Sequence, residues 1–88
     1  MDKLFQVRII TPERIVFRGQ VSSVVAPGEA GYLEILANHA PIISGLVKGK
    51  ITLKESHKKS LFQSSGNGFL QVLNNQVVLL LDKVSDLE

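Results

Sequence analysis

The residues most able to do chemistry in this sequence lie in one short stretch, "NHAPIISGL", which covers residues 38–46. It holds a histidine, His39, and a serine, Ser44, five positions further on. Such a pair can act as a nucleophile and its base, provided that an acid orients the imidazole. The sequence nominates no such acid, and no glycine-flanked nucleophile turn surrounds the serine. A small hydrolase that uses His39 is therefore the weakest of the functions considered for this chain.

The other groups that could carry chemistry are scattered. The second histidine, His57, lies in a lysine-rich turn, and the eight carboxylates occur singly. There is no ligand spacing typical of zinc, and the absence of cysteine excludes disulfides and thiolate ligands. The segment "SSGNGF" is rich in glycine but lacks the lysine of a phosphate-binding loop, and it leads into an expected strand. We therefore expect no catalytic residue, no cofactor and no metal.

The elements that must position these residues are strands, because the dominant hydrophobic period is two. In "KITLKE", Ile51 and Leu53 face one side while lysine and threonine face the other, which is typical of a half-buried antiparallel strand. Similar patterns predict strands at residues 4–10, 20–26, 31–36, 60–64, 68–73 and 76–81. Turn residues recur between them, and no amphipathic helix longer than a turn or two is present. The sequence therefore predicts an all-β fold, either a sandwich or a small barrel.

The segment from residue 68 to residue 82 raises two more specific expectations. Asn74 and Asn75 separate two strand patterns, and asparagine tolerates the positive φ of a tight turn, so we predict a hairpin. The run "VVLLL" at 77–81 is apolar on both faces. It is either central between two sheets or partly exposed for a partner.

The stretch that contains His39 has an alternative to catalysis. Pro41 favours extended geometry before it and removes a sheet donor, so we expect a loop here. Ile42, Ile43 and Leu46 give this loop more apolar surface than a connector needs. These side chains either fold back into the core or face a partner, and the sequence leaves both possibilities open.

Length and hydropathy indicate one domain over residues 1–88. A chain of this size can fold alone without much margin. No signal peptide is visible, and the longest apolar run is far too short to span a membrane. We therefore expect a soluble single-domain protein without direct membrane insertion.

The charge is small, at +2, but half of the ten basic residues fall in one segment. These are Lys48, Lys50, Lys54, Lys58 and Lys59. One interpretation is the solvated face and tip of a hairpin. The other is a patch for anionic partners, and a small nucleic-acid-binding module is the alternative function that we carry forward. No aromatic residue between Tyr32 and Phe62 supports base stacking.

Three ordered blocks resemble the ε subunit of F-type ATP synthases. The segment "EAGYLEILANHAPIISGLVKGKITL" resembles the family pattern G-E-x-G-I-x-P-G-H-A-P-L-x-x-x-x-x-x-G-x-I-x-I, and "SGNGFLQVLNNQVVLLLD" resembles its following strand pair. The positions in register, including those of the N-terminal block, are Val7, Thr11, Phe17, Gly19, Gly31, Ile35, His39, Ala40, Pro41, Gly49, Ile51, Gly68, Leu70, Val72, Val77 and Asp82. The likeness covers essentially all 88 residues.

This resemblance implies a ten-stranded antiparallel β-sandwich that acts as a non-catalytic rotor subunit of the central stalk. It implies that the domain bridges the γ subunit and the membrane c-ring, so that proton-driven rotation is coupled to ATP synthesis. The expected location is peripheral, at the cytoplasmic face of the bacterial inner membrane or an equivalent energy-transducing membrane. No nucleic-acid partner is implied.

The resemblance also implies two sets of contact residues. Those expected to face γ are Thr11, His39, Ala40, Pro41, Ile42, Ile43 and Ser44. Those expected to approach the c-ring are Glu29, Ala30, Gly31 and Tyr32. Among the first set, Ile42 and Ile43 are the predicted apolar anchors. His39 either contacts the partner or only fixes its own loop.

The sequence departs from the family pattern in several places. Ala37 and Asn38 replace a proline and a glycine, although Asn38 can still take a left-handed conformation. Tyr32 and Glu34 stand where an acid and a glycine are common. The C-terminal helical hairpin and its ATP-recognition motif are absent after "LDKVSDLE". We therefore expect neither ATP binding nor inhibition of the hairpin type.

Overall fold

The computed structural model describes residues 3–87, which form ten strands joined by short turns. The strands are β1 (Phe5–Ile10), β2 (Ile15–Val21), β3 (Ser23–Gly28), β4 (Gly31–Leu36), β5 (Ile42–Leu46), β6 (Gly49–Lys54), β7 (Lys59–Ser64), β8 (Gly68–Leu73), β9 (Gln76–Leu81) and β10 (Val84–Asp86). This part of the chain has no helix that could cross a membrane.

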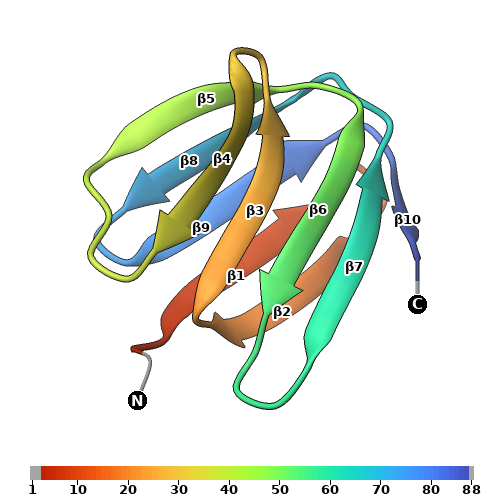
Figure 1. The fold of residues 1–88 in the computed structure, drawn as a ribbon. Helices are drawn as coiled ribbons and strands as arrows, with labels where there is room; N and C mark the ends of the chain where they lie inside the picture. The colour runs from red at the N-terminus through yellow and green to blue at the C-terminus, as the bar shows by residue number, and fades with distance from the viewer. Residues whose placement is uncertain (1–2, 88) are drawn as a thin grey trace.

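The strands form two layers that face each other (Figure 1). The first layer has the order β10-β7-β6-β3-β4, and the second has the order β5-β8-β9-β1-β2. The layers join where β3 passes to β5, through the single register pair Gly28 and Leu46. The predicted all-β sandwich of ten strands is confirmed.

The prediction that all strands are antiparallel is wrong for one pair. β1 and β9 run parallel, with Val7 beside Val77 and Ile9 beside Leu79. A parallel pair needs a long connection, and here almost the whole domain lies between the two strands. Hydrophobic alternation reports which face a residue takes but not the direction of its neighbour, so the sequence could not reveal this pairing.

Two boundaries also differ from the sequence prediction. The expected strand at 20–26 is broken at Ser22, whose backbone N–H donates to the Lys54 carbonyl over 2.7 Å, so its halves belong to β2 and β3. The expected loop at 38–46 ends early, because β5 begins at Ile42 and pairs with β8. Pro41 precedes this strand, where its missing N–H costs no ladder hydrogen bond.

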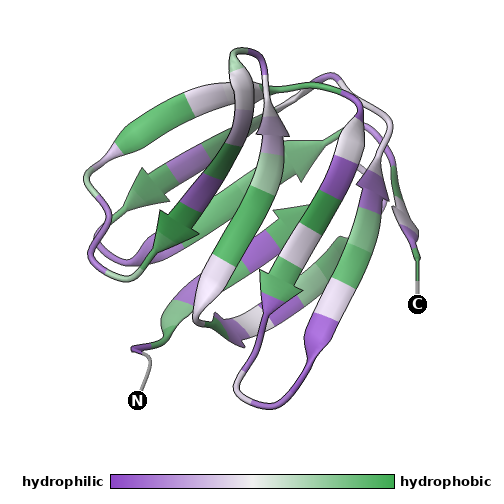
Figure 2. Cartoon of the chain, viewed as in Figure 1, coloured by the Kyte–Doolittle hydropathy of each residue, from purple (hydrophilic) through white to green (hydrophobic). Residues whose placement is uncertain are grey.

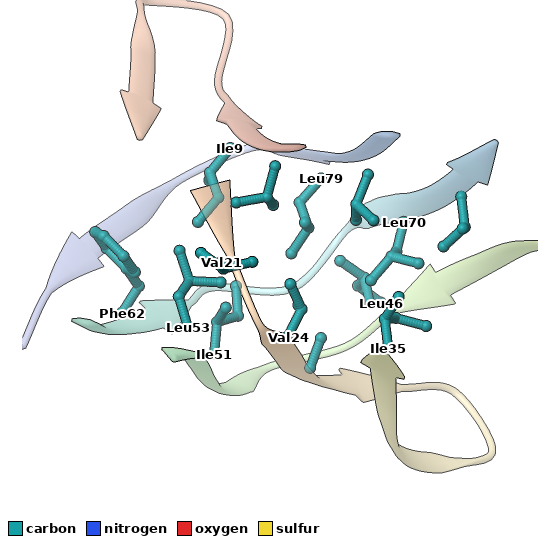
Figure 3. Packing of buried hydrophobic residues seen from close by; sticks show 14 of the residues in the cluster. Ile9, Val21, Val24, Ile35, Leu46, Ile51, Leu53, Phe62, Leu70 and Leu79 are labelled. Carbon is teal, nitrogen blue, oxygen red and sulfur yellow. The ribbon is translucent and has the colours of Figure 1, made fainter. Parts of the chain in front are cut away.

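The core fills the space between the layers with aliphatic side chains from nearly every strand (Figure 3). As predicted, Ile51 and Leu53 of β6 are fully buried while the lysines beside them are exposed. Phe17 of β2 and Phe62 of β7 meet edge to face across the layers, with ring centroids 6.0 Å apart. Among the described residues, every buried side-chain polar atom has a hydrogen-bond partner.

The segment from β8 to β9 was expected to form a hairpin and to carry a strand that is apolar on both faces. Asn74 and Asn75 have φ of 51° and 59° and form the turn of the predicted hairpin. Figure 2 shows β9 as a continuous hydrophobic strand. Its inward residues are buried, but Leu80 on its outward side is 48% exposed. The run "VVLLL" therefore leaves an uncovered apolar face.

Candidate functional site

His39 and Ser44 do not form a catalytic pair. The Nδ1 atom of His39 lies 2.7 Å from the carbonyl oxygen of Ala40, which can only accept, so Nδ1 donates. The Ser44 hydroxyl donates to the Gly45 carbonyl over 3.1 Å. Each side chain is thus engaged within its own segment, and neither is bonded to the other. His39 fixes its loop, whether or not it also contacts a partner.

The loop that carries His39 is clamped to the β8–β9 turn by two asparagines. Asn38 has a φ of 65°, the left-handed conformation expected where the family has glycine. Its backbone N–H donates to the side-chain carbonyl of Asn75 over 2.5 Å, and the Asn75 amide donates back to the Asn38 side chain over 2.9 Å. This reciprocal pair holds the loop against a hairpin 37 residues away in sequence.

The apolar residues of β5 divide between the core and the surface. Ile42 packs against the buried cluster, and Leu46 belongs to it. Ile43 points the other way and is 73% exposed. Ile42 and Leu46 therefore take the core role, and Ile43 stays on the surface, because side chains alternate along a strand. Of the two predicted anchors, only Ile43 faces outward.

Thr11 lies at the end of β1, in the turn that leads to β2. Its backbone N–H donates to the Arg14 carbonyl over 2.9 Å, and its hydroxyl bonds to the same residue. The side chain is only 9% exposed. Thr11 closes its own turn and also lines a cavity of about 350 Å³ beside β8 and β9.

Next to this cavity, four apolar side chains form a row across the outward side of the second layer. Phe69 of β8 is the register partner of Leu80 of β9. Leu80 pairs with Ile10 of β1, which in turn pairs with Ile15 of β2. Phe69 is 58% exposed, and Leu80 and Ile15 are each 48% exposed. A contiguous apolar surface of this kind is a candidate contact site for another molecule.

Two more rows complete this outward surface. The middle row is Ile43, Gln71, Val78, Arg8 and Arg18. The third row is Leu73, Gln76, Gln6 and Gln20. We call the surface formed by these three rows the outer face. It changes from apolar at the cavity end to amide-rich at the β8–β9 turn.

The turn between β3 and β4 protrudes at one end of the sandwich, opposite the β6–β7 turn (Figure 1). Glu29, Ala30, Gly31 and Tyr32 are all exposed there. A Cβ atom on Gly45 would lie 2.5 Å from the Glu29 carboxyl carbon, so glycine at 45 lets that carboxylate lie over β5. The Tyr32 hydroxyl accepts the Lys50 N–H over 3.0 Å, which turns the ring toward β6.

The five lysines of the basic segment are exposed on and around the β6–β7 hairpin, as expected if this segment forms the solvated face and tip of a hairpin. Lys54 and Lys59 are direct register partners. Within residues 3–87, no group of three or more histidine, cysteine, aspartate or glutamate side chains is placed to hold a metal ion.

Most of the outer face is not apparent from the sequence. Phe69, Leu80 and Ile15 come from strands far apart in the sequence, and none lies within residues 38–46. The signal was present in the alternation, because Phe69 and Leu80 occupy outward positions that polar residues usually fill on a solvated sheet. Only the sheet order shows that these exceptions are neighbours.

Comparison with known proteins gives a consistent result. Residues 4–86 match the family described as "ATP synthase, Delta/Epsilon chain, beta-sandwich domain". The chain is 42% identical over 85 residues to the ATP synthase epsilon chain of Chlorobium limicola, covering 96% of both chains. It is 38% identical to the ATP synthase epsilon chain of Dichelobacter nodosus, covering 97% of this chain and 59% of that longer one.

Two solved structures share the fold. A chain of the Euglena gracilis mitochondrial ATP synthase, in a structure of OSCP, F1 and the c-ring, superposes with a TM-score of 0.87 at 17% identity. The match covers 94% of this chain and 53% of that one. A chain from the central stalk and c-ring of the Tetrahymena thermophila enzyme gives a TM-score of 0.80 at 16% identity, covering 97% and 68%. At such low identity the likeness shows the fold alone.

Proposed function

The chain belongs to the ATP synthase delta/epsilon chain family, and from this premise we propose that it links the γ subunit to the c-ring in an F-type ATP synthase. It is an epsilon subunit, a component of the central stalk in a membrane-associated complex. Its role is mechanical and not catalytic, and its position is the cytoplasmic face of the energy-transducing membrane. Nothing in the comparisons favours the nucleic-acid alternative.

The outer face is the surface that docks on γ. The observation that carries this is the apolar row, in which Phe69, Leu80 and Ile15 remain about half exposed after folding. Fully burying one such side chain contributes about 1.5–3 kcal/mol, so three half-exposed residues supply several kcal/mol toward association. Ile43 extends the apolar surface along β5 toward the His39 loop.

The β3–β4 turn is the contact to the c-ring. Its four residues are exposed, and the Glu29 carboxylate lies over Gly45 near this end of the sandwich. The position of that carboxylate depends on Gly45, and Tyr32 is held by its bond to Lys50. A turn that is fixed on both sides can transmit force without first deforming.

The sandwich between these two contacts works as a stiff spacer. Its close-packed interior is nearly incompressible compared with a flexible linker, because few voids are available to collapse. A torque applied by the ring at the β3–β4 turn is then delivered to γ at the outer face. A spacer that transmits torque in this way needs neither a cofactor nor a catalytic group.

Binding to purified γ tests the docking surface. We expect Phe69→Asp combined with Leu80→Asp to raise the Kd more than tenfold, because charge replaces apolar contact in the row. Leu87→Asp is the matched control, since Leu87 is also 48% exposed but follows β10 on the other layer. Equal affinity of the double variant and wild type would rule out this face.

These 88 residues lack the ATP-recognition motif, so we also propose that the domain does not bind ATP by itself. Isothermal titration of the chain with MgATP should give only heats of dilution. A saturable isotherm would contradict this part of the proposal without affecting the docking surface.

A further inference from the structure

Two arginines lie side by side on the outer face without an acidic neighbour. Arg8 of β1 and Arg18 of β2 are direct register partners, and both point outward. Within the described residues 3–87, neither guanidinium has a hydrogen bond or an ion pair. The five strands of this layer contain no aspartate or glutamate at all.

The Glu29 carboxylate, which lies against the outer face at β5, is too distant to neutralise the pair. The Glu29 carboxylate lies over Gly45 of β5, and β5 is three strands from β1. At about 4.8 Å between strands, the separation is roughly 14 Å. That exceeds the Debye length of about 8 Å at physiological salt, so solvent screens most of the attraction.

A like-charge pair of this kind is unfavourable in the free domain, and it stays unfavourable under an apolar partner surface. Like charges directly opposite each other on antiparallel strands destabilise the sheet. Covering the pair with an apolar surface would add the cost of desolvating two unpaired cations. A partner that docks here must therefore bring negative charge to this position, or leave it open to water.

A hollow beside Arg8 is suited to receive that charge. It measures about 290 Å³ and is lined by Arg8, Gln71, Leu73, Asn74, Gln76 and Val78. The guanidinium offers a planar fork of donors, and the three amides add further N–H groups. Because a water occupies about 30 Å³, the hollow has room for a carboxylate group with some of its solvent.

We propose that this hollow receives a carboxylate side chain from the partner surface, bound by Arg8 with Arg18 beside it. The inference rests on the proposed docking of γ on the outer face. It specifies the chemistry of the matching surface, which is apolar opposite Phe69 and Leu80 and acidic opposite the arginines. The apolar row then supplies affinity, while the arginine pair fixes orientation and accelerates encounter.

A protein carboxylate fits this position better than a lipid headgroup. The arginines lie in the middle row of the outer face, on β1 and the edge strand β2, so a bilayer that reached them would also have to cover the flanking apolar and glutamine rows. On the free domain, the exposed lysines of the β6–β7 hairpin offer an anionic lipid surface a more accessible basic contact than the arginine pair does. Arginine binds both carboxylates and phosphates in a bidentate geometry, so the test includes anionic vesicles as well as γ.

The test measures binding to purified γ at about 50 mM and about 300 mM salt. The variants are Arg8→Gln, Arg18→Gln and their combination, with Lys58→Gln on the β6–β7 hairpin as a control that removes the same charge. We expect the double variant to raise the Kd at least tenfold at low salt, which is about 1.4 kcal/mol, and to weaken the salt dependence. Lys58→Gln should change neither quantity.

Charge reversal gives a second, independent readout. Arg8→Glu should abolish binding at low salt, and replacing one aspartate or glutamate of γ with lysine should restore it. Thermal melts of each variant establish that the domain remains folded, and removal of one arginine should not lower its melting temperature.

Three results would overturn the inference. If wild type and the double arginine variant bind γ equally, the carboxylate contact is wrong while the docking face stands. If wild type does not bind γ at all, both the inference and the proposed function fail. If the double variant loses binding to vesicles of phosphatidylglycerol and phosphatidylcholine but keeps its affinity for γ, the arginines serve a lipid surface instead.

Discussion

Ile42 and Ile43 provide an internal comparison, because identical side chains on consecutive residues point to opposite sides of β5. Ile43 is 73% exposed, whereas Ile42 packs against the core. Replacing each with alanine should therefore separate affinity from stability. Ile43→Ala should weaken binding to γ and leave the fold unchanged, and Ile42→Ala should do the reverse.

The magnitudes follow from the burial of each residue. Full burial of an isoleucine contributes about 1.5–3 kcal/mol, so covering the exposed part of Ile43 is worth roughly 1–2 kcal/mol. Its loss should raise the Kd for γ about 5- to 30-fold. Ile42→Ala removes a partly buried side chain and should lower the free energy of unfolding by about 1–3 kcal/mol, with Kd unchanged for the folded fraction.

Urea unfolding followed by far-UV circular dichroism gives the stabilities, and titration calorimetry with γ gives the affinities. The control is the wild-type chain carried through both assays in the same buffer. If Ile43→Ala binds γ as tightly as wild type, Ile43 is not an anchor. If Ile42→Ala weakens binding without loss of stability, the assignment of the two faces of β5 is reversed.

Three further predictions concern the fold itself. Asn38→Ala should lower the free energy of unfolding by about 1.5–3 kcal/mol, because alanine tolerates a φ of 65° poorly and the side-chain bond from Asn75 is lost. Asn38→Gly loses the same bond without the strain and should lower it by about 1 kcal/mol or less, so equal thermal melts of the two variants would count against strain at this left-handed position. Gly68→Ala should lower the free energy of unfolding by about 1–3 kcal/mol, since the added Cβ would lie 2.2 Å from the Leu80 carbonyl oxygen. If urea unfolding gives this variant the same stability as wild type, that close approach is wrong. Lys59→Glu should raise stability by about 0.2–1 kcal/mol by pairing with Lys54 across the β6–β7 hairpin, and the gain should vanish at about 1 M salt; a gain that survives the salt would need another cause.

The features that could be predicted from sequence are those that depend on neighbouring residues. The alternation of apolar and polar residues in β6 predicted that Ile51 and Leu53 lie in the core. The Asn74-Asn75 pair predicted the β8–β9 hairpin, because asparagine tolerates positive φ. In both cases the physical cause lies within a few residues, so no knowledge of the fold was required. The left-handed geometry at Asn38 was expected from the resemblance, because the family has glycine at this position and asparagine can take the same conformation.

The features that could not be predicted depend on sheet order. The parallel pairing of β1 with β9 joins the two ends of the domain, and nothing in either strand specifies that direction. The apolar row combines single outward residues, such as Phe69 and Leu80, that look like isolated exceptions along the chain. The arginine pair is likewise visible only once β1 and β2 are placed in register.

The central claim is that γ covers the outer face of the second layer and leaves the first layer free. Methyl NMR of the labelled chain, recorded with and without purified γ, tests it most directly. The account predicts large shifts for the methyl groups of Ile43, Leu80 and Ile15, and none for Val25 and Leu61 on the opposite layer. Shifts confined to Val25 and Leu61, or a spectrum that γ leaves unchanged, would contradict it.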